Sequence, residues 1–289
     1  MRLKRRQPNS GPAEFRIIGH RGARGLFPEN TIEGIHASLA SGVTRFEIDV
    51  GVTADGVAVV YHDPLLNPDI TRGPDGAWLA EGGPPLCTLK LAELHRFDVG
   101  RIRPGSAYAA RYPEQEPADG ARIPTLEAML RAAPEALFTI ELKSDPTRPE
   151  LSVSGPEMAE RVVATAERMG AIQRIRVQSF DWRGPRHLRR VRPDIARAWL
   201  TAPKTVAAAV LWWGRASAGG SVAEAVAAEG GGVWSPERRS LKRGAVEEAH
   251  RLGIAVIPWT VNEPAEMARL KNWGVDGLIS DRPDLARGL

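Results

Sequence analysis

Residues 44–50 read TRFEIDV, a run of strand length that ends in two carboxylates, Glu47 and Asp49. Successive side chains of a strand alternate between its two faces, so Glu47 and Asp49 lie on one face and Ile48 on the other. Charged side chains on the inner face of a buried sheet are costly unless they are paired or bind a metal. The segment therefore predicts a strand whose end carries chemistry.

Apolar runs of similar length recur along the chain and alternate with helical stretches, which is typical of repeated βα units with parallel strands. The helical stretches end at breakers such as Gly42, Gly170 and Gly253. Eight such units predict a (β/α)₈ TIM barrel in the α/β class. The predicted strands are Arg16–Gly19, Thr44–Val50, Ala136–Leu142, Arg174–Ser179, Ile195–Leu200, Gly232–Trp234, Ile254–Trp259 and Asp276–Ser280.

One connection is too long for this pattern. Residues 64–122 are rich in proline and glycine and contain one clear helix, Thr88–Phe97. A loop of this length inside a compact domain is usually functional or mobile. We therefore predict one barrel over residues 16–289, with 64–122 inserted after the second strand, and a flexible basic tail over 1–15.

The composition is that of a globular protein, with 43% hydrophobic and 26% charged residues. The net charge of +4 comes without a nucleic-acid motif, so we expect a small anionic substrate and no nucleic acid. The single cysteine, Cys87, excludes a disulfide framework, and a cytoplasmic location is expected. No signal peptide is recognisable, and the most apolar segment, Val206–Trp213, is too short for stable membrane insertion. The oligomeric state is left open.

Polar residues at strand ends are the candidate site, because barrel enzymes react at the C-terminal ends of their strands. The first strand runs into His20 and Arg21, and the third ends in Glu141 and Lys143. Glu47, Asp49 and Glu141 make an all-oxygen site that suits one divalent cation, Mg²⁺ or Ca²⁺, with Mn²⁺ as a further candidate. Arg21 and Lys143 are expected to hold phosphate oxygens.

A second histidine follows from turn chemistry. Asp55-Gly56 is a strong signal for a two-residue hairpin, which would place Asp49 opposite His62 with Cβ atoms ~5 Å apart. Histidine titrates near neutrality, so His20 and His62 can divide the work of activating a nucleophile and protonating a leaving alkoxide. These groups together predict a phosphodiester site.

The order of these motifs resembles the glycerophosphodiester phosphodiesterase family over about residues 16 to 285. The joint occurrence of so many spaced motifs is far more specific than any one of them. The motifs are His20-Arg21-Gly22, Pro28-Glu29-Asn30-Thr31, Glu47-x-Asp49, Thr53-x-Asp55-Gly56, His62-Asp63, Glu141-x-Lys143, Ser179-Phe180, Trp259-Thr260-Val261-Asn262 and Asp276-Gly277-x-Ile279-Ser280-Asp281.

The resemblance implies metal-dependent hydrolysis of glycerophosphodiesters to an alcohol and glycerol 3-phosphate. It implies that the insertion caps the barrel mouth. It also implies a role for each matched residue: metal ligation by Glu47, Asp49 and Glu141, acid/base catalysis by His20 and His62, phosphate contact by Arg21 and Lys143, a structural or substrate-orienting role for Asn30, and a wall of the substrate pocket at Trp259.

Three alternatives stay open. A lysophospholipase-D-like enzyme would use the insertion and Trp212-Trp213 to accommodate an acyl chain. A barrel without catalysis would serve as a phosphate-binding module. The three acids could instead form a salt-bridge cluster with Arg21, Arg45 and Lys143.

Overall fold

The computed structural model describes residues 14–214 and 220–289, so the predicted tail over 1–15 lies almost wholly outside the described residues. The strands are β1 (Arg16–His20), β2 (Arg45–Val52), β3 (Ala58–Val60), β4 (Leu137–Leu142), β5 (Ile175–Ser179), β6 (Ala196–Thr201), β7 (Val233–Pro236), β8 (Ala255–Val256) and β9 (Gly277–Ser280). The α-helices are α1 (Ile32–Ala40), α2 (Leu91–Leu94), α3 (Ala107–Arg111), α4 (Leu126–Ala132), α5 (Gly155–Arg168), α6 (Arg183–Val191), α7 (Pro203–Ala207), α8 (Ala209–Trp213), α9 (Val222–Ala228), α10 (Arg243–Arg251) and α11 (Pro264–Asn272). Short 3₁₀ helices are η1 (Leu86–Thr88), η2 (Pro149–Leu151), η3 (Ile172–Arg174), η4 (Arg238–Ser240) and η5 (Pro283–Ala286).

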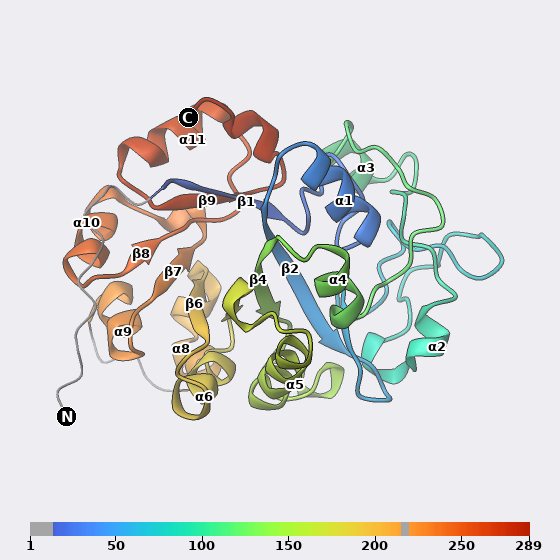
Figure 1. Cartoon of the computed structure of the whole chain (residues 1–289), viewed down its shortest axis with the longest axis horizontal. Helices are drawn as coiled ribbons and strands as arrows, with labels where there is room; N and C mark the ends of the chain where they lie inside the picture. Colours follow the sequence, from blue (N-terminus) through green and yellow to red (C-terminus); the bar gives the residue numbers. More distant parts are fainter. Residues whose placement is uncertain (1–13, 215–219) are drawn as a thin grey trace.

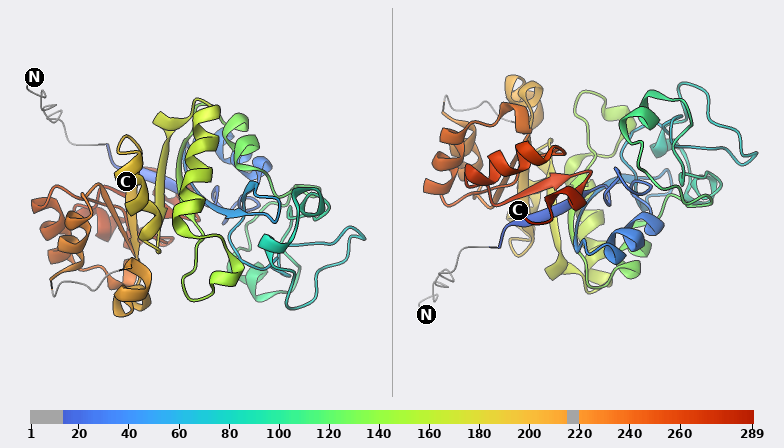
Figure 2. Two further views of the ribbon diagram at one scale, coloured as in Figure 1. Left: turned by 90° about the horizontal axis from the view of Figure 1, so that it is seen from below. Right: turned by 90° about the horizontal axis from the view of Figure 1, so that it is seen from above.

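Parallel strands form a barrel with helices around it (Figures 1 and 2). In the described part of the chain, eight parallel strands follow the order β8-β7-β6-β5-β4-β2-β1-β9. Main-chain hydrogen bonds join the two ends of this order: the Asp276 N–H donates to the Val256 carbonyl at 2.8 Å, and the Ile279 N–H donates to the Pro258 carbonyl at 3.0 Å. The predicted TIM barrel is confirmed.

The antiparallel hairpin of β2 and β3 exists, but the predicted register is wrong by one residue. Val50 pairs with Val60, and the Tyr61 N–H donates to the Asp49 carbonyl at 3.0 Å, so Tyr61 and not His62 lies opposite Asp49. The Gly56 N–H donates to the Thr53 carbonyl and Gly56 has a φ of 80°. The loop is therefore a three-residue turn with a left-handed glycine, which shifts the pairing relative to a two-residue turn.

Two apolar clusters fill the space between the barrel and its helices. One packs α4 and α5 against β2 and β4 through residues such as Met129, Val162 and Ile140. The other packs α10 and α11 against β7 to β9 through residues such as Val246 and Leu270. Fully burying a side chain of this size contributes roughly 1.5–3 kcal/mol, so these clusters hold the strand ends in place.

Residues 64–122 form the long segment that follows the hairpin, and they lie at the right of Figure 1. They share a small core with β3, which includes Leu66, Leu86, Leu94 and Ile123. The predicted helix Thr88–Phe97 is reduced to the one-turn α2, and the helix α3 was not predicted. The packing of this segment therefore depends on contacts with the barrel more than on helical propensity.

Trp213 lies in the core and not on the surface. Its ring stacks on that of Trp182 with centroids 4.2 Å apart, and the side chain is buried. Helix packing therefore explains Trp213, whereas Trp212 packs edge-on against Phe180. Among the described residues, no helix is long and apolar enough to cross a bilayer.

Candidate active site

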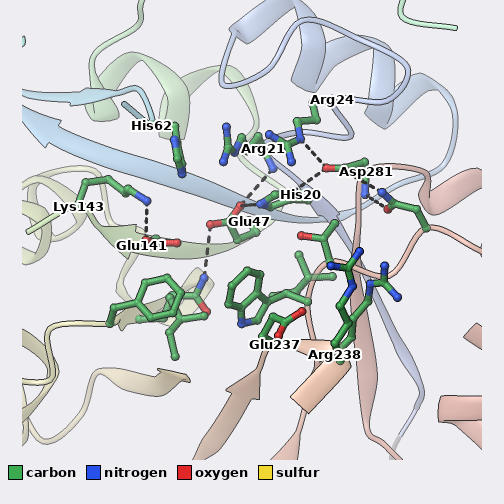
Figure 3. A pocket seen from close by; sticks show the side chains of 18 of the residues that line it. His20, Arg21, Arg24, Glu47, His62, Glu141, Lys143, Glu237, Arg238 and Asp281 are labelled. Carbon is green, nitrogen blue, oxygen red and sulfur yellow. Dashed lines mark hydrogen bonds and ion pairs between the residues drawn. The ribbon is translucent and has the colours of Figure 1, made fainter. Parts of the chain in front are cut away.

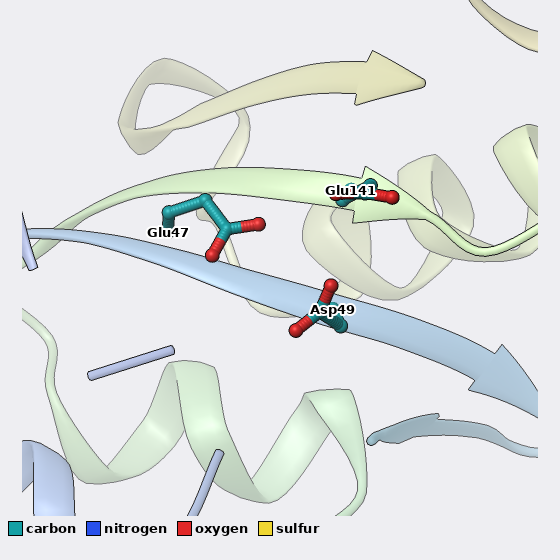
Figure 4. Close-up of side chains that lie close together, drawn as sticks. All are labelled: Glu47, Asp49 and Glu141. Atoms are coloured by element: carbon teal, nitrogen blue, oxygen red, sulfur yellow. The ribbon is translucent and has the colours of Figure 1, made fainter. Parts of the chain in front are cut away.

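Three buried carboxylates converge from β2 and β4: Glu141 lies near the C-terminal end of β4, and Glu47 and Asp49 lie midway along β2 (Figure 4). The parallel register pairs Asp49 with Glu141. Because side chains alternate along β2, Glu47 projects to the same face as Asp49. One oxygen from each of the three carboxylates lies within 4.8 Å of the others. The predicted set of acids is therefore brought together, with the geometry of a possible metal site.

The charges of these acids are unequally compensated. Burial, together with repulsion from Asp49 and Glu141, raises the pKa of Glu47 well above its usual range. Burial also raises the pKa of Glu141, although Lys143 opposes this. For Asp49 burial is outweighed by His62, Lys143 and Arg21, which hold its pKa below the usual range. Ionisation of all three carboxylates is therefore costly unless a further positive charge lies among them.

Asp49 is held from the side by Asn30. The Asn30 side-chain amide donates to Asp49 Oδ2 at 2.9 Å, and the Asp49 N–H donates to Asn30 Oδ1 at 3.3 Å. Asn30 has a φ of 56°, in the left-handed region that asparagine tolerates. Asp49 Oδ1 is buried and accepts no hydrogen bond from any residue in the described ranges, although Lys143 Nζ lies 3.5 Å away. One carboxylate oxygen is left for another ligand.

His20 ends β1 beside this cluster (Figure 3). Its Nδ1 lies 2.6 Å from Asp281 Oδ1, and its Nε2 lies 3.8 Å from Glu47 Oε2. Burial and the charge of Arg24 lower the pKa of His20, although Asp281 opposes both. The imidazole is therefore neutral at pH 7, with Nε2 towards the acids.

His62 follows β3 and faces the same site despite the shifted register. Its Nδ1 lies 2.6 Å from Asp63 Oδ1, so this ring too is held by a carboxylate. Burial and the charges of Arg21 and Lys143 lower the pKa of His62 well below its usual range. Both predicted histidines therefore line the pocket at the barrel mouth.

Two predicted cations lie beside the acids. Lys143 Nζ donates to Glu141 Oε1 at 2.7 Å. Arg21 Nη1 donates to Glu29 Oε1 at 2.9 Å, and Arg21 Nε lies 3.4 Å from Asp49 Oδ2. Burial lowers the pKa of Lys143, but the attraction of Glu141 and Asp49 outweighs it and raises the pKa. Both side chains carry charge at neutral pH.

A cavity of about 320 Å³ is lined by both histidines, by Arg21 and Lys143, and by Glu47 and Glu141, whereas Asp49 is fully buried and does not line it. Trp259 forms part of its wall, as predicted, with its ring edge-on to Phe180 at 5.4 Å and its Nε1 donating to the Ser235 carbonyl at 2.9 Å. Asn30 is absent from the lining and acts on the site through Asp49. The other predicted site residues lie at or directly beside this cavity. The alternative salt-bridge cluster is wrong for Arg45, whose partner is Glu14, but Lys143 does pair with Glu141 and Asp49, and Arg21 does pair with Asp49.

Several residues at the barrel mouth were not predicted as site residues from the sequence. Asp281 ends β9 and holds both His20 and Arg24, whose Nε donates to Asp281 Oδ1 at 2.7 Å. Asp281 stands in a quoted motif, but only barrel closure brings it to β1. Gln178 on β5 and Arg111 on α3 also line the cavity, so the segment 64–122 reaches the mouth through α3.

The closed barrel and the groups at its mouth define a class, the TIM-barrel phosphodiesterases. Within this class the chain belongs to the glycerophosphoryl diester phosphodiesterase family, whose model matches residues 20–285. It is therefore an enzyme, a phosphoric diester hydrolase of that family.

Relatives match nearly the whole chain. A glycerophosphodiester phosphodiesterase of Bacillus subtilis is 27% identical over 283 residues, which cover 95% of this chain and 86% of that protein. A crystal structure of a candidate glycerophosphoryl diester phosphodiesterase from Silicibacter pomeroyi has a TM-score of 0.87 at 36% identity, covering 96% of this chain and 93% of the other. A phosphodiesterase of Oleispira antarctica, solved with the product sn-glycerol-3-phosphate, shares the fold at 22% identity and a TM-score of 0.69, with 93% of each chain covered.

Proposed function

We propose that the enzyme hydrolyses a glycerophosphodiester to an alcohol and glycerol 3-phosphate, using one divalent cation and two acid/base histidines. The observation that carries this proposal is the convergence of three carboxylates, with oxygens within 4.8 Å of one another, at the barrel mouth. His20 and His62 line the same cavity, together with Arg21 and Lys143. The cavity therefore combines a place for a cation with groups that bind phosphate and transfer protons.

Glu47, Asp49 and Glu141 would hold the cation. Their oxygen donors suit Mg²⁺ or Ca²⁺, with Mn²⁺ as a further candidate. The raised pKa of Glu47 and the unpartnered Oδ1 of Asp49 support a cation here, because a buried carboxylate without compensation is costly. When bound, the cation would polarise a phosphoryl oxygen as a Lewis acid.

Arg21 and Lys143 would bind the non-bridging phosphate oxygens. Both are charged at neutral pH, and charge-assisted hydrogen bonds to phosphate are stronger than neutral ones. Trp259 would form a wall for the glycerol or alcohol portion. For Asn30 we propose an orienting role towards Asp49, since its amide is bound to that carboxylate and does not line the cavity.

His20 and His62 would each use Nε2 to take a proton from, or give a proton to, the reacting oxygen atoms. Each ring binds a carboxylate through Nδ1, which leaves Nε2 for the reacting atoms. A neutral ring can take the proton of the attacking hydroxyl at Nε2, and the partner ring, once it has taken up a proton from solvent at Nε2, would donate that proton to the departing alkoxide. Attack by water and attack by a neighbouring substrate hydroxyl through a cyclic phosphate both require this pair.

A metal-by-substrate panel tests the proposal. The purified protein is freed of metal with chelator and assayed with Mg²⁺, Ca²⁺ and Mn²⁺ for release of glycerol 3-phosphate from glycerophosphocholine. We expect turnover only with a divalent cation. Equal turnover in chelator would contradict the metal role, and binding without turnover under every metal would favour the non-catalytic phosphate-binding barrel.

Lysophosphatidylcholine is the discriminating second substrate. The lysophospholipase-D-like alternative requires an apolar surface for an acyl chain, but Trp213 is buried against Trp182. We therefore expect preference for glycerophosphocholine.

We also propose that residues 64–122 cap the barrel mouth, and the presence of Arg111 in the cavity wall supports this. The cytoplasmic location stays a prediction.

A further inference from the structure

A second cluster of charge lies at the opposite end of the barrel from the proposed catalytic site. Arg45 precedes Glu47 by two positions on β2, and Arg176 precedes Gln178 by two on β5. Because side chains alternate along a strand, these arginines share the inner face with Glu47 and Gln178, one layer closer to the strand starts. Arg16, the first residue of β1, joins them.

A cavity of about 160 Å³ lies among these strand starts. Arginine dominates its lining, which also includes apolar side chains of β4 and β5. The polar lining residues are Arg16, Arg45, Thr139, Gln173, Arg174 and Arg176. The volume accommodates several water molecules, each of which occupies about 30 Å³ in the liquid, or one small ion with its remaining hydration.

The arginines of this cavity have few acidic partners. Arg45 Nη2 lies 3.4 Å from Glu14, whose side chain is 84% exposed. Arg174 donates to the main-chain carbonyls of Leu130, Ala133 and Ala136. Within residues 14–214 and 220–289, Arg176 forms no side-chain hydrogen bond or ion pair. Residues 1–13 and 215–219 contain no aspartate or glutamate, so their side chains supply no carboxylate either.

Uncompensated charge of this kind is costly. Burial, with repulsion from Arg16 and Arg45, lowers the pKa of Arg176 to about 10. The guanidinium is nevertheless charged at neutral pH, so it cannot relieve the repulsion by losing its proton. An anion between the three side chains would remove this cost.

We propose that this end of the barrel binds a phosphate-class oxyanion between Arg16, Arg45 and Arg176, at a site separate from the catalytic mouth. Guanidinium groups match tetrahedral oxyanions through paired charge-assisted N–H donors. The small recess selects a compact anion, either inorganic phosphate or the phosphate group of a small phosphomonoester. Binding here stabilises the floor of the barrel and requires no turnover.

Thermal unfolding with added phosphate tests this site. Chelator is present throughout to prevent phosphate from binding through a metal at the mouth, and sodium chloride keeps the ionic strength constant. We expect the Tm of the wild-type protein to rise and saturate with phosphate, because a ligand that binds only the folded state stabilises it. Glycerol 3-phosphate is the second probe, and the anion whose Tm shift falls more when Arg176 is replaced identifies the occupant of this site.

Arg176→Met is the test variant. It should raise the Tm without phosphate, since it removes an unpaired, half-buried charge, and weaken phosphate binding at least ~10-fold, as loss of one charge-assisted contact does. Arg251→Met is the matched control. Arg251 is exposed at the end of α10, just before β8, so its replacement removes the same charge at the same end of the barrel but outside the cavity. The Tm of this variant should rise with phosphate as that of the wild-type protein does. Equal phosphate responses in all three proteins would overturn the site.

Crystals soaked in tungstate, a phosphate-shaped ion with strong anomalous scattering, locate the anion directly. A peak among Arg16, Arg45 and Arg176 supports the proposal. A peak at the catalytic mouth alone overturns it. If Arg176→Met does not fold, Arg45→Gln serves instead, because the Arg45 side chain is 32% exposed and its loss leaves Arg176 in place.

Discussion

His20 Nδ1 lies 2.6 Å from Asp281 Oδ1, although the two residues are 261 positions apart. The contact exists because β1 and β9 are neighbours in the closed barrel, with Gly19 paired to Ser280. Asp281 also accepts from Arg24 and from the Asn262 amide, so its carboxylate is fixed on several sides. The first and last strands therefore contribute to one hydrogen-bonded group at the barrel mouth.

Replacement of Asp281 by Asn should reduce kcat/KM by ~10–100-fold, as loss of a partner that orients a functional histidine does. Asp281 opposes the lowering of the His20 pKa by burial and Arg24, so its loss lowers that pKa further. The limb of the kcat/KM profile that His20 controls should move to lower pH. Asp284→Asn, which removes a surface partner of Arg282, is the control. An unmoved profile would show that Asp281 acts only on stability.

Replacement of His20 or His62 by Ala should reduce kcat by at least ~10²-fold, because each variant removes one proton-transfer group. Steady-state assay at saturating metal measures this. His187→Ala is the matched control, since His187 pairs with Glu160 on the helical surface and lies outside the cavity. Normal turnover in either active-site variant would exclude the two-histidine mechanism.

Replacement of Glu141 by Gln should weaken cation binding by more than the ~10–100-fold that an outer-shell partner costs. Titration calorimetry with Mn²⁺ and Mg²⁺ gives the affinity. The wild-type protein should gain about 2.7 kcal/mol of stability at a cation concentration of 100 Kd, whereas the variant gains less at that concentration. Glu127→Gln on α4, which loses only a surface pair with Arg131, should bind as wild type. Equal affinities would remove Glu141 from the ligand set.

The acidic cluster could be predicted because its causes are local. Alternation along a strand put Glu47 and Asp49 on one face, and parallel pairing of strand ends brought Glu141 to them. His62 also reached the site, but for a partly wrong reason. The Asp55-Gly56 pair allows turns of two or three residues, and the hydrogen bonds of Thr53 select the longer one.

Other site residues depend on contacts that have no local signal. Asp281 reaches His20 through closure of the barrel, which brings the last strand to the first. The helix α3 is only five residues long, and its position comes from packing on the barrel. The unpaired charge of Arg176 also could not be predicted, because it depends on which side chains the neighbouring strands bring beside it.

Tyr108 on α3 connects the segment 64–122 to the catalytic groups. Its hydroxyl contacts Glu29 and accepts from Arg24 Nη1 at 3.0 Å. Glu29 in turn holds Arg21, and Arg24 holds Asp281. The hydroxyl therefore supports both the proposed phosphate ligand and the partner of His20.

Replacement of Tyr108 by Phe should reduce kcat/KM by roughly tenfold or more, because at least one hydrogen bond to a charged group, of about 1.5 kcal/mol, is lost. The ring remains, so packing on α3 is preserved and the Tm should change little. Tyr112→Phe is the matched control: its ring contacts Tyr108 at 5.0 Å and lies under Arg24, but its hydroxyl forms no hydrogen bond within the described residues. Equal kinetics for the two variants would show that α3 contributes packing alone, whereas a loss confined to Tyr108→Phe makes its hydroxyl a positioning group for the barrel mouth.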